Sequence, residues 1–197
     1  MKRFSPDRAG FTLIETIIAM ALVGLVLTKL MLVIDEARRA HEDESVTMML
    51  EDQAMELVDR IAFAIVGSAR EKLTPTQFAP LTSERIRYQL SLGVEDGAVV
   101  WGDPEVIGLE QEAGEVYWNQ NEGEANERRV VWANTVSQML EDELLNGIDD
   151  NGNSLADELG LSFVLEGDSV MIRLSLERER EGKKVQVTKE TTVTCRN

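Results

Sequence analysis

The sequence has few of the residues from which most catalytic sites are built. Its 197 residues include one cysteine, Cys195, and one histidine, His41. No disulfide can therefore form within the chain, and Ser-His-Asp or Cys-His catalytic groups have little to draw on. The sequence also has no glycine-rich phosphate-binding loop and no cysteine cluster. We expect no enzymatic activity.

Basic side chains are scarce as well. The chain has 20 Lys and Arg against 36 Asp and Glu, which gives a net charge of −16. A protein that coats nucleic acid needs the opposite sign of charge, so we expect no nucleic-acid partner. Residues 35–197 alone hold 34 acidic and 16 basic side chains, a net charge of −18.

The sequence has a single long apolar run, from Phe11 to Ile34. A helix of this length spans about 36 Å, enough to cross a hydrocarbon core of about 30 Å. Basic residues precede the run and Asp35-Glu36 follow it, which favours an amino terminus inside the cell and a body outside. No small-x-small cleavage site follows the run, so a conventional secretory signal is disfavoured. We expect a single-pass membrane protein.

One ionisable residue, Glu15, lies inside the apolar run, where a charge is costly and needs a reason. The segment Gly10-Phe11-Thr12-Leu13-Ile14-Glu15, after a short basic leader, resembles the type III signal of type IV pilins and pseudopilins. The resemblance covers about the first 30 residues. Leu32 stands where many major pilins have a helix-breaking proline, so the sequence does not support a locally melted segment near Gly24.

That resemblance implies a maturation pathway and a set of partners. A prepilin peptidase would cleave between Gly10 and Phe11 on the cytoplasmic side, and the new amine of Phe11 would be methylated. The acid at Glu15 would pair with the amino terminus of a neighbouring pseudopilin or pilin during assembly. A cation in a helix bundle makes a buried carboxylate tolerable.

The segment after Ile34 is amphipathic. Its apolar face recurs at steps of three and four residues, through Val46, Leu50, Ala54, Leu57, Ile61, Ile65 and Ser68. This spacing predicts a helix that packs against the protein's own sheet rather than only against a partner. Gly67 and Pro75 are stop signals, so we expect a nearly continuous helix from Thr12 to Ala69.

The remainder of the chain is rich in turns and alternating apolar residues. We expect strands at 85–92, 98–101, 115–119, 129–133, 163–165, 170–176 and 185–194, and a short helix within 134–145. The alternation on the first strand points Ile86, Tyr88, Leu90 and Leu92 to one side. Polar alternate positions predict an antiparallel sheet with one face on the stem helix and one face in water.

These elements predict an α+β, pilin-like fold. Its parts are a leader at 1–10, a membrane and assembly helix at 11–34, an amphipathic stem at 35–70 and a β-rich head at 71–197. The size and strand order of the head resemble the J-type minor pseudopilins of type II secretion systems, or the W-type minor pilins.

A loop near residue 150 has the composition of a calcium site. Side-chain oxygens alternate at Asp149, Asn151 and Asn153, with a carbonyl at Leu155, a carboxylate at Asp157 and a further carboxylate at Glu158. Oxygens at this spacing in a tight turn converge on a hard cation, and the pattern is similar to an EF-hand loop. Ser154 replaces the expected sixth-position glycine, and Gly160 replaces the twelfth-position glutamate. The alternatives are a structural Ca²⁺ site and an Asx-rich surface turn.

Three functions follow in order of preference. The first is a minor pseudopilin in the bacterial inner membrane, with its head in the periplasm, that assembles with other pseudopilins and contacts secreted protein cargo. The second is a minor type IV pilin in adhesion or DNA uptake. The third is a membrane-anchored calcium-binding receptor or enzyme.

Overall fold

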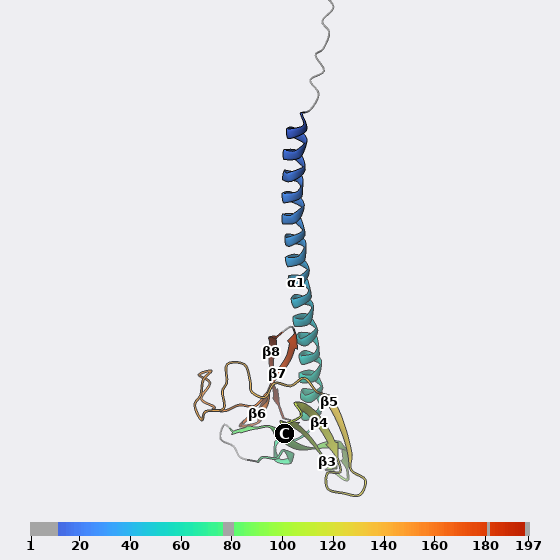
Figure 1. The fold of residues 1–197 in the computed structure, drawn as a ribbon. Coiled ribbons are helices and arrows are strands. Elements are labelled where there is room, and N and C mark those ends of the chain that lie inside the picture. The colour runs from blue at the N-terminus through green and yellow to red at the C-terminus, as the bar shows by residue number, and fades with distance from the viewer. Residues whose placement is uncertain (1–11, 77–80, 181, 196–197) are drawn as a thin grey trace, which may run out of the picture. The chain divides into compact units, whose positions relative to one another are not determined.

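The computed structural model describes residues 12–76, 81–180 and 182–195. Its one long helix, α1, runs from Leu13 to Val66 without a break (Figure 1). The expected continuous helix is therefore confirmed, and it ends immediately before Gly67. The chain divides into two compact units, Met1–Ser45 and Val46–Asn197, each of which is described by itself.

In the first unit, α1 is apolar on all sides. Each large apolar side chain from Leu13 to Ile34 is exposed, so none of them contributes to a protein core within this chain. The polar character begins at Asp35, whose carboxylate pairs with Arg39 at 2.9 Å. This segment is an apolar rod of the kind that a membrane or a helix bundle must cover.

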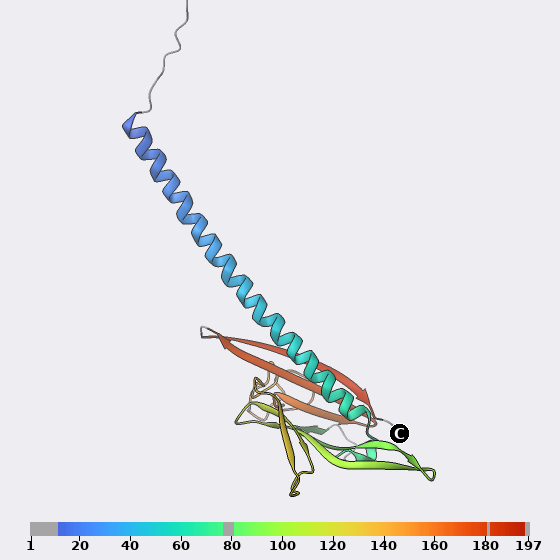
Figure 2. The same cartoon turned by 90° about the vertical axis from the view of Figure 1, so that its right-hand side faces the viewer.

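In the second unit, one face of α1 packs on the head. The buried residues of the helix are Leu50, Ala54, Leu57, Val58, Ile61 and Ile65. They join one hydrophobic core with side chains of both sheets, among them Ile86, Ile107, Phe163 and Ile172. The prediction that the stripe is buried against the protein's own sheet is confirmed. Figure 2 shows the end of α1 running along the strands of the head.

The head contains two four-stranded antiparallel sheets. The first has the order β2-β3-β4-β5, with β2 at Arg85–Glu95, β3 at Ala98–Glu110, β4 at Glu115–Gln120 and β5 at Arg128–Ala133. The second has the order β1-β6-β7-β8, with β1 at Leu81–Ser83, β6 at Leu161–Glu166, β7 at Ser169–Arg180 and β8 at Lys183–Thr194. A short 3-10 helix, η1 at Arg70–Lys72, follows α1. The α+β, pilin-like fold is confirmed.

Strand β3 and one predicted core position differ from expectation. Strand β3 continues past Trp101, through Pro104, to Glu110. Leu92 was expected on the same side as Ile86 and Tyr88, but it is 70% exposed. The reason is that the register of β2 against β3 shifts on both sides of Ser91, which breaks the simple alternation.

The predicted short helix within 134–145 is wrong. This segment is irregular and pairs with the second sheet instead: Val136 bridges to Leu176, and Met139 bridges to Leu159. The N–H of Ser137 donates to the carbonyl of Ser175 at 2.9 Å. Val136 and Leu140 are buried four residues apart, which mimics helical spacing although each side chain packs from an extended backbone.

The expectation of a sheet with one face in water is also wrong for β6. The first five residues of this strand are buried, so both of its faces are covered. Phe163 faces the core, whereas Ser162 on the opposite face accepts or donates a 2.7 Å hydrogen bond with Thr82 and donates one to Glu158 at 3.3 Å. The loop that contains Glu158 therefore covers part of the face that was expected to meet water.

Candidate assembly helix and acidic loop

The amino-terminal end of α1 holds its acidic residue in a capping arrangement. The N–H of Thr12 donates to Oε2 of Glu15 at 3.3 Å, and the N–H of Glu15 donates to Oγ1 of Thr12 at 3.4 Å. This reciprocal pair is a capping box. It places the carboxylate beside the unpaired N–H groups and the positive end of the helix dipole. Gly10 and Phe11, the predicted processing residues, lie outside the described residues.

The helix that follows suits a membrane. Across the part of the chain that the structure describes, α1 is the one helix long and apolar enough to cross a bilayer, with a mean hydropathy of 2.6 in its apolar window. Thr28 donates its hydroxyl to the carbonyl of Gly24 at 2.8 Å, so this polar side chain is satisfied within the helix. The helix continues through Leu32 without interruption, as the absence of proline there predicts.

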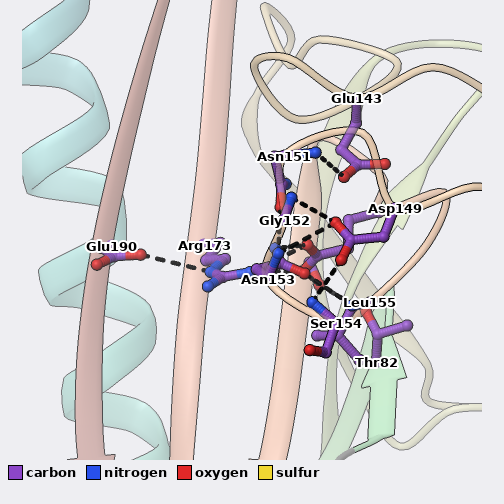
Figure 3. Close-up of polar contacts among 12 residues, drawn as sticks. Thr82, Glu143, Asp149, Asn151, Gly152, Asn153, Ser154, Leu155, Arg173 and Glu190 are labelled. Atoms are coloured by element: carbon purple, nitrogen blue, oxygen red, sulfur yellow. Dashed lines mark hydrogen bonds and ion pairs between the residues drawn. The ribbon is translucent and has the colours of Figure 1, made fainter.

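The predicted cation loop is ordered around Asp149. Its Oδ1 accepts hydrogen bonds from the N–H groups of Gly152 at 2.6 Å and Asn153 at 3.1 Å, and its Oδ2 accepts one from Ser154 at 2.7 Å (Figure 3). Desolvation raises the pKa of Asp149, but these hydrogen bonds outweigh it and hold the pKa below its usual range. Ser154 has a φ of 71°, the left-handed conformation for which glycine is expected at that position.

A second carboxylate holds the other end of the loop. Oδ1 of Asp157 accepts hydrogen bonds from the N–H groups of Asn146 at 2.8 Å and Gly147 at 2.9 Å. The amide oxygen of Asn151 accepts one from the N–H of Asn153 at 3.1 Å. The predicted ligands Asp149 and Asp157 therefore both bind backbone N–H groups of the loop itself.

Glu158 is directed away from the loop and toward the second sheet. Nη1 of Arg173, on β7, lies 2.9 Å from Oε1 and 3.0 Å from Oε2 of this carboxylate. The amide nitrogen of Asn153 also donates to Oε2, and the amide oxygen of Asn153 accepts a bond from the N–H of Leu155 at 2.8 Å. Nε of Arg173 is 3.4 Å from Glu190 on β8, and Figure 3 shows Arg173 between Glu190 and the loop.

Gly160 has a packing reason that the sequence pattern does not reveal. A Cβ at this position would lie 1.8 Å from the carbonyl oxygen of Ser137. The carbonyl of Gly160 also accepts a 2.7 Å hydrogen bond from Ser175 on β7. Because two segments of backbone meet here, no side chain fits, and the twelfth-position glutamate of an EF-hand is excluded.

The structure adds one acidic residue that was not among the predicted ligands. Glu143 is 4% exposed, and its Oε1 accepts a 3.3 Å hydrogen bond from the N–H of Asn151. Its Oε2 is buried and has no hydrogen-bond partner among the described residues. No sequence signal separates Glu143 from its acidic neighbours Glu141 and Asp142, because only the fold buries one of the three.

The carboxylates of the loop are thus spread over several partners. Within residues 12–76, 82–180 and 182–195, no three Asp, Glu, His or Cys side chains are grouped so that they could hold a metal ion. Asp149 and Asp157 organise the loop backbone, while Glu158 neutralises Arg173. An ionised carboxylate has about four lone-pair positions, so the bound N–H groups leave acceptor capacity on Asp149 and Asp157. The calcium site stays a prediction.

Comparison with known proteins supports the reading of the amino terminus. Residues 6–28 match the family model of the prokaryotic N-terminal methylation motif, which supports a type IV pilin-like, prepilin-processed subunit. The matched range includes Gly10, Phe11 and Glu15. No curated protein and no solved structure matches the chain.

Proposed function

We propose that this prepilin-like chain is a minor pseudopilin, a structural subunit of a type II protein secretion system. Prepilin peptidase removes residues 1–10, the amine of Phe11 is methylated, and the apolar helix enters a short periplasmic pseudopilus. One observation carries this proposal: the methylation motif at 6–28 leads directly into an unbroken helix whose first half is apolar on all sides.

The position of Glu15 supports an electrostatic step in assembly. Its carboxylate lies at the first turn of α1, four residues after Phe11, whose amine becomes the new amino terminus. In a packed bundle of apolar helices, this carboxylate is costly unless a cation meets it. The amino terminus of a neighbouring subunit supplies that cation, and this pairing sets the axial offset between subunits.

The charge distribution supports the proposed topology. The leader carries Lys2, Arg3 and Arg8 against Asp7, while residues 35–197 carry a net charge of −18. Basic residues are retained on the cytoplasmic side of a membrane span. We place the head in the periplasm on this basis, where its acidic surface contacts other pseudopilins or secreted cargo. The role is structural and involves no catalysis.

Assembly through Glu15 is tested by comparing Glu15→Ala with Glu36→Ala in full-length protein produced with its partner pseudopilins. Glu36 is an exposed acid on the same helix, beyond the apolar run. We expect Glu15→Ala to be cleaved normally and to be lost from pelleted filaments, with Glu36→Ala unaffected. Normal filament entry of Glu15→Ala would contradict the proposed pairing.

Deletion of the gene in its host separates the two machineries that use this maturation. A pseudopilin deletion blocks the appearance of secreted enzymes in the medium and leaves surface filaments intact. Loss of surface filaments, adhesion or DNA uptake with normal secretion would instead assign the chain to a type IV pilus.

A further inference from the structure

We propose that the loop at 141–150 is a docking surface for a protein that presents an apolar recess rimmed by Lys and Arg. Three large aliphatic side chains of this loop are exposed: Leu144 by 64%, Leu145 by 75% and Ile148 by 62%. They lie within five consecutive residues of the head. The proposal concerns this loop alone, and it is independent of processing at Gly10.

The exposure of these side chains is not a general property of the segment. Val136 and Leu140, a few residues earlier, are 5% and 4% exposed and pack on the second sheet. The segment therefore buries the aliphatic side chains that stabilise the head and leaves the next three in water. Leaving large apolar groups exposed together costs free energy, and such clusters mark interaction sites.

Hydrogen bonds hold the backbone of the cluster in place. The N–H of Leu144 donates to Asp150 at 3.2 Å, and the N–H of Ile148 donates to the amide oxygen of Asn146 at 2.7 Å. Asp157 fixes Asn146 and Gly147 between them. A loop that is already ordered loses little conformational entropy on binding, so its apolar contacts contribute more of their free energy to affinity.

The surrounding charge specifies the partner. Residues 141–158 contain seven acidic side chains and no Lys or Arg, and Glu141, Asp142 and Asp150 are exposed beside the aliphatic cluster. A partner rimmed by basic side chains is attracted to this surface, and an acidic partner is repelled. A second copy of the chain is disfavoured for the same reason, because its residues 35–197 carry a net charge of −18. An anionic membrane surface is also repelled.

The test uses full-length protein in zwitterionic lipid nanodiscs and three fluorescent helical peptides. One peptide has a leucine face rimmed by lysine, the second replaces lysine with glutamate, and the third replaces leucine with serine. The variant Leu144→Ser/Leu145→Ser/Ile148→Ser is compared with Leu92→Ser/Val94→Ser/Val99→Ser, whose aliphatic side chains are exposed on the β2–β3 hairpin. Anisotropy gives the affinity, and hydrogen exchange locates the contact.

We expect the leucine-lysine peptide to bind the wild-type protein more tightly than the other two and to protect residues 141–150 from exchange. The loop variant should lose at least about tenfold in affinity, whereas the hairpin variant should stay within about twofold, and added salt should weaken binding. Equal binding of the three peptides, or equal affinity of both variants, would overturn the proposal. Self-association of the wild-type protein through this loop, seen by sedimentation, would also overturn it.

Discussion

Nη1 of Arg173 lies between the two carboxylate oxygens of Glu158, at 2.9 Å from one and 3.0 Å from the other. The side chain of Glu158 is 0% exposed and that of Arg173 is 16% exposed. This ion pair joins the acidic loop to strand β7. The loop is thereby part of the folded head, although its sequence has the composition of a surface turn.

Loss of the charge on Glu158 should destabilise the head. In Glu158→Gln, the guanidinium of Arg173 remains largely buried without its main counter-charge, so we expect the free energy of unfolding to fall by about 3 kcal/mol. The measurement is urea unfolding of the full-length protein in detergent, followed by circular dichroism. Glu110→Gln is the matched control, because Glu110 pairs with Arg129 on the surface at 3.3 Å, where the expected loss is below about 1 kcal/mol. Similar losses in both variants would show that the buried pair does not anchor the loop.

Gly160→Ala should be more harmful than its small size suggests. Its Cβ would lie 1.8 Å from the carbonyl oxygen of Ser137, so the backbone of 136–138 must move away from β7. We expect a loss of about 2 to 3 kcal/mol in the free energy of unfolding. Gly102→Ala serves as the control, since its Cβ would make ordinary contacts at 3.4 to 3.5 Å with Leu92 and Leu90. Equal stability of the two variants would contradict the close approach of these segments.

Tyr88 should make the head sensitive to alkali. Burial raises the pKa of Tyr88, and Glu105, which accepts its hydroxyl hydrogen bond at 2.7 Å, raises it further. The folded state therefore keeps a proton that the unfolded state releases above pH of about 10. The stabilisation is fully present below that pH and is lost above it, by up to about 1.4 kcal/mol per pH unit.

The check on Tyr88 is urea unfolding between neutral and alkaline pH. Tyr88→Phe should remove this part of the alkaline slope, while Tyr117→Phe, at the other buried tyrosine of the sheet, should retain it. An unchanged slope in Tyr88→Phe would mean that another group titrates.

Calcium binding at the loop can be measured directly. We predict that calorimetry of the full-length protein in detergent detects Ca²⁺ binding, because Asp149, Asn151, Asn153 and Asp157 supply hard oxygen ligands in one turn. Asp149→Ala and Asp157→Ala should each abolish it. Asp103→Ala, outside the loop, should not. Indifference of binding to both loop substitutions, or absence of binding in the wild-type protein, would leave the loop as an Asx-rich turn.

The parts of the fold that depend on regular periodicity could be predicted from the sequence. The steps of three and four through Leu50, Ala54, Leu57, Ile61 and Ile65 predicted the buried face of α1, because a helix repeats every 3.6 residues. Alternation likewise located β7 and β8. Leu92 was misplaced because a change of register leaves no mark in the alternation.

The acidic loop could be predicted only in part. Its oxygen-rich composition was evident, and Asp149 does order the turn. The pairing of Glu158 with Arg173 links residues that are far apart on different elements, and the burial of Glu143 depends on how the chain folds around it. Gly160 illustrates the same limit, because its requirement arises from contact with Ser137, more than 20 residues earlier. Local patterns carry no information on such contacts.

Processing of the amino terminus is the central claim, and mass spectrometry of the mature protein tests it most directly. The account predicts a chain that begins at Phe11 and carries one additional methyl group on its amine, with α1 retained. The same protein produced without prepilin peptidase should keep residues 1–10. A mature chain that still begins at Met1, or one cut after residue 34, would contradict the account.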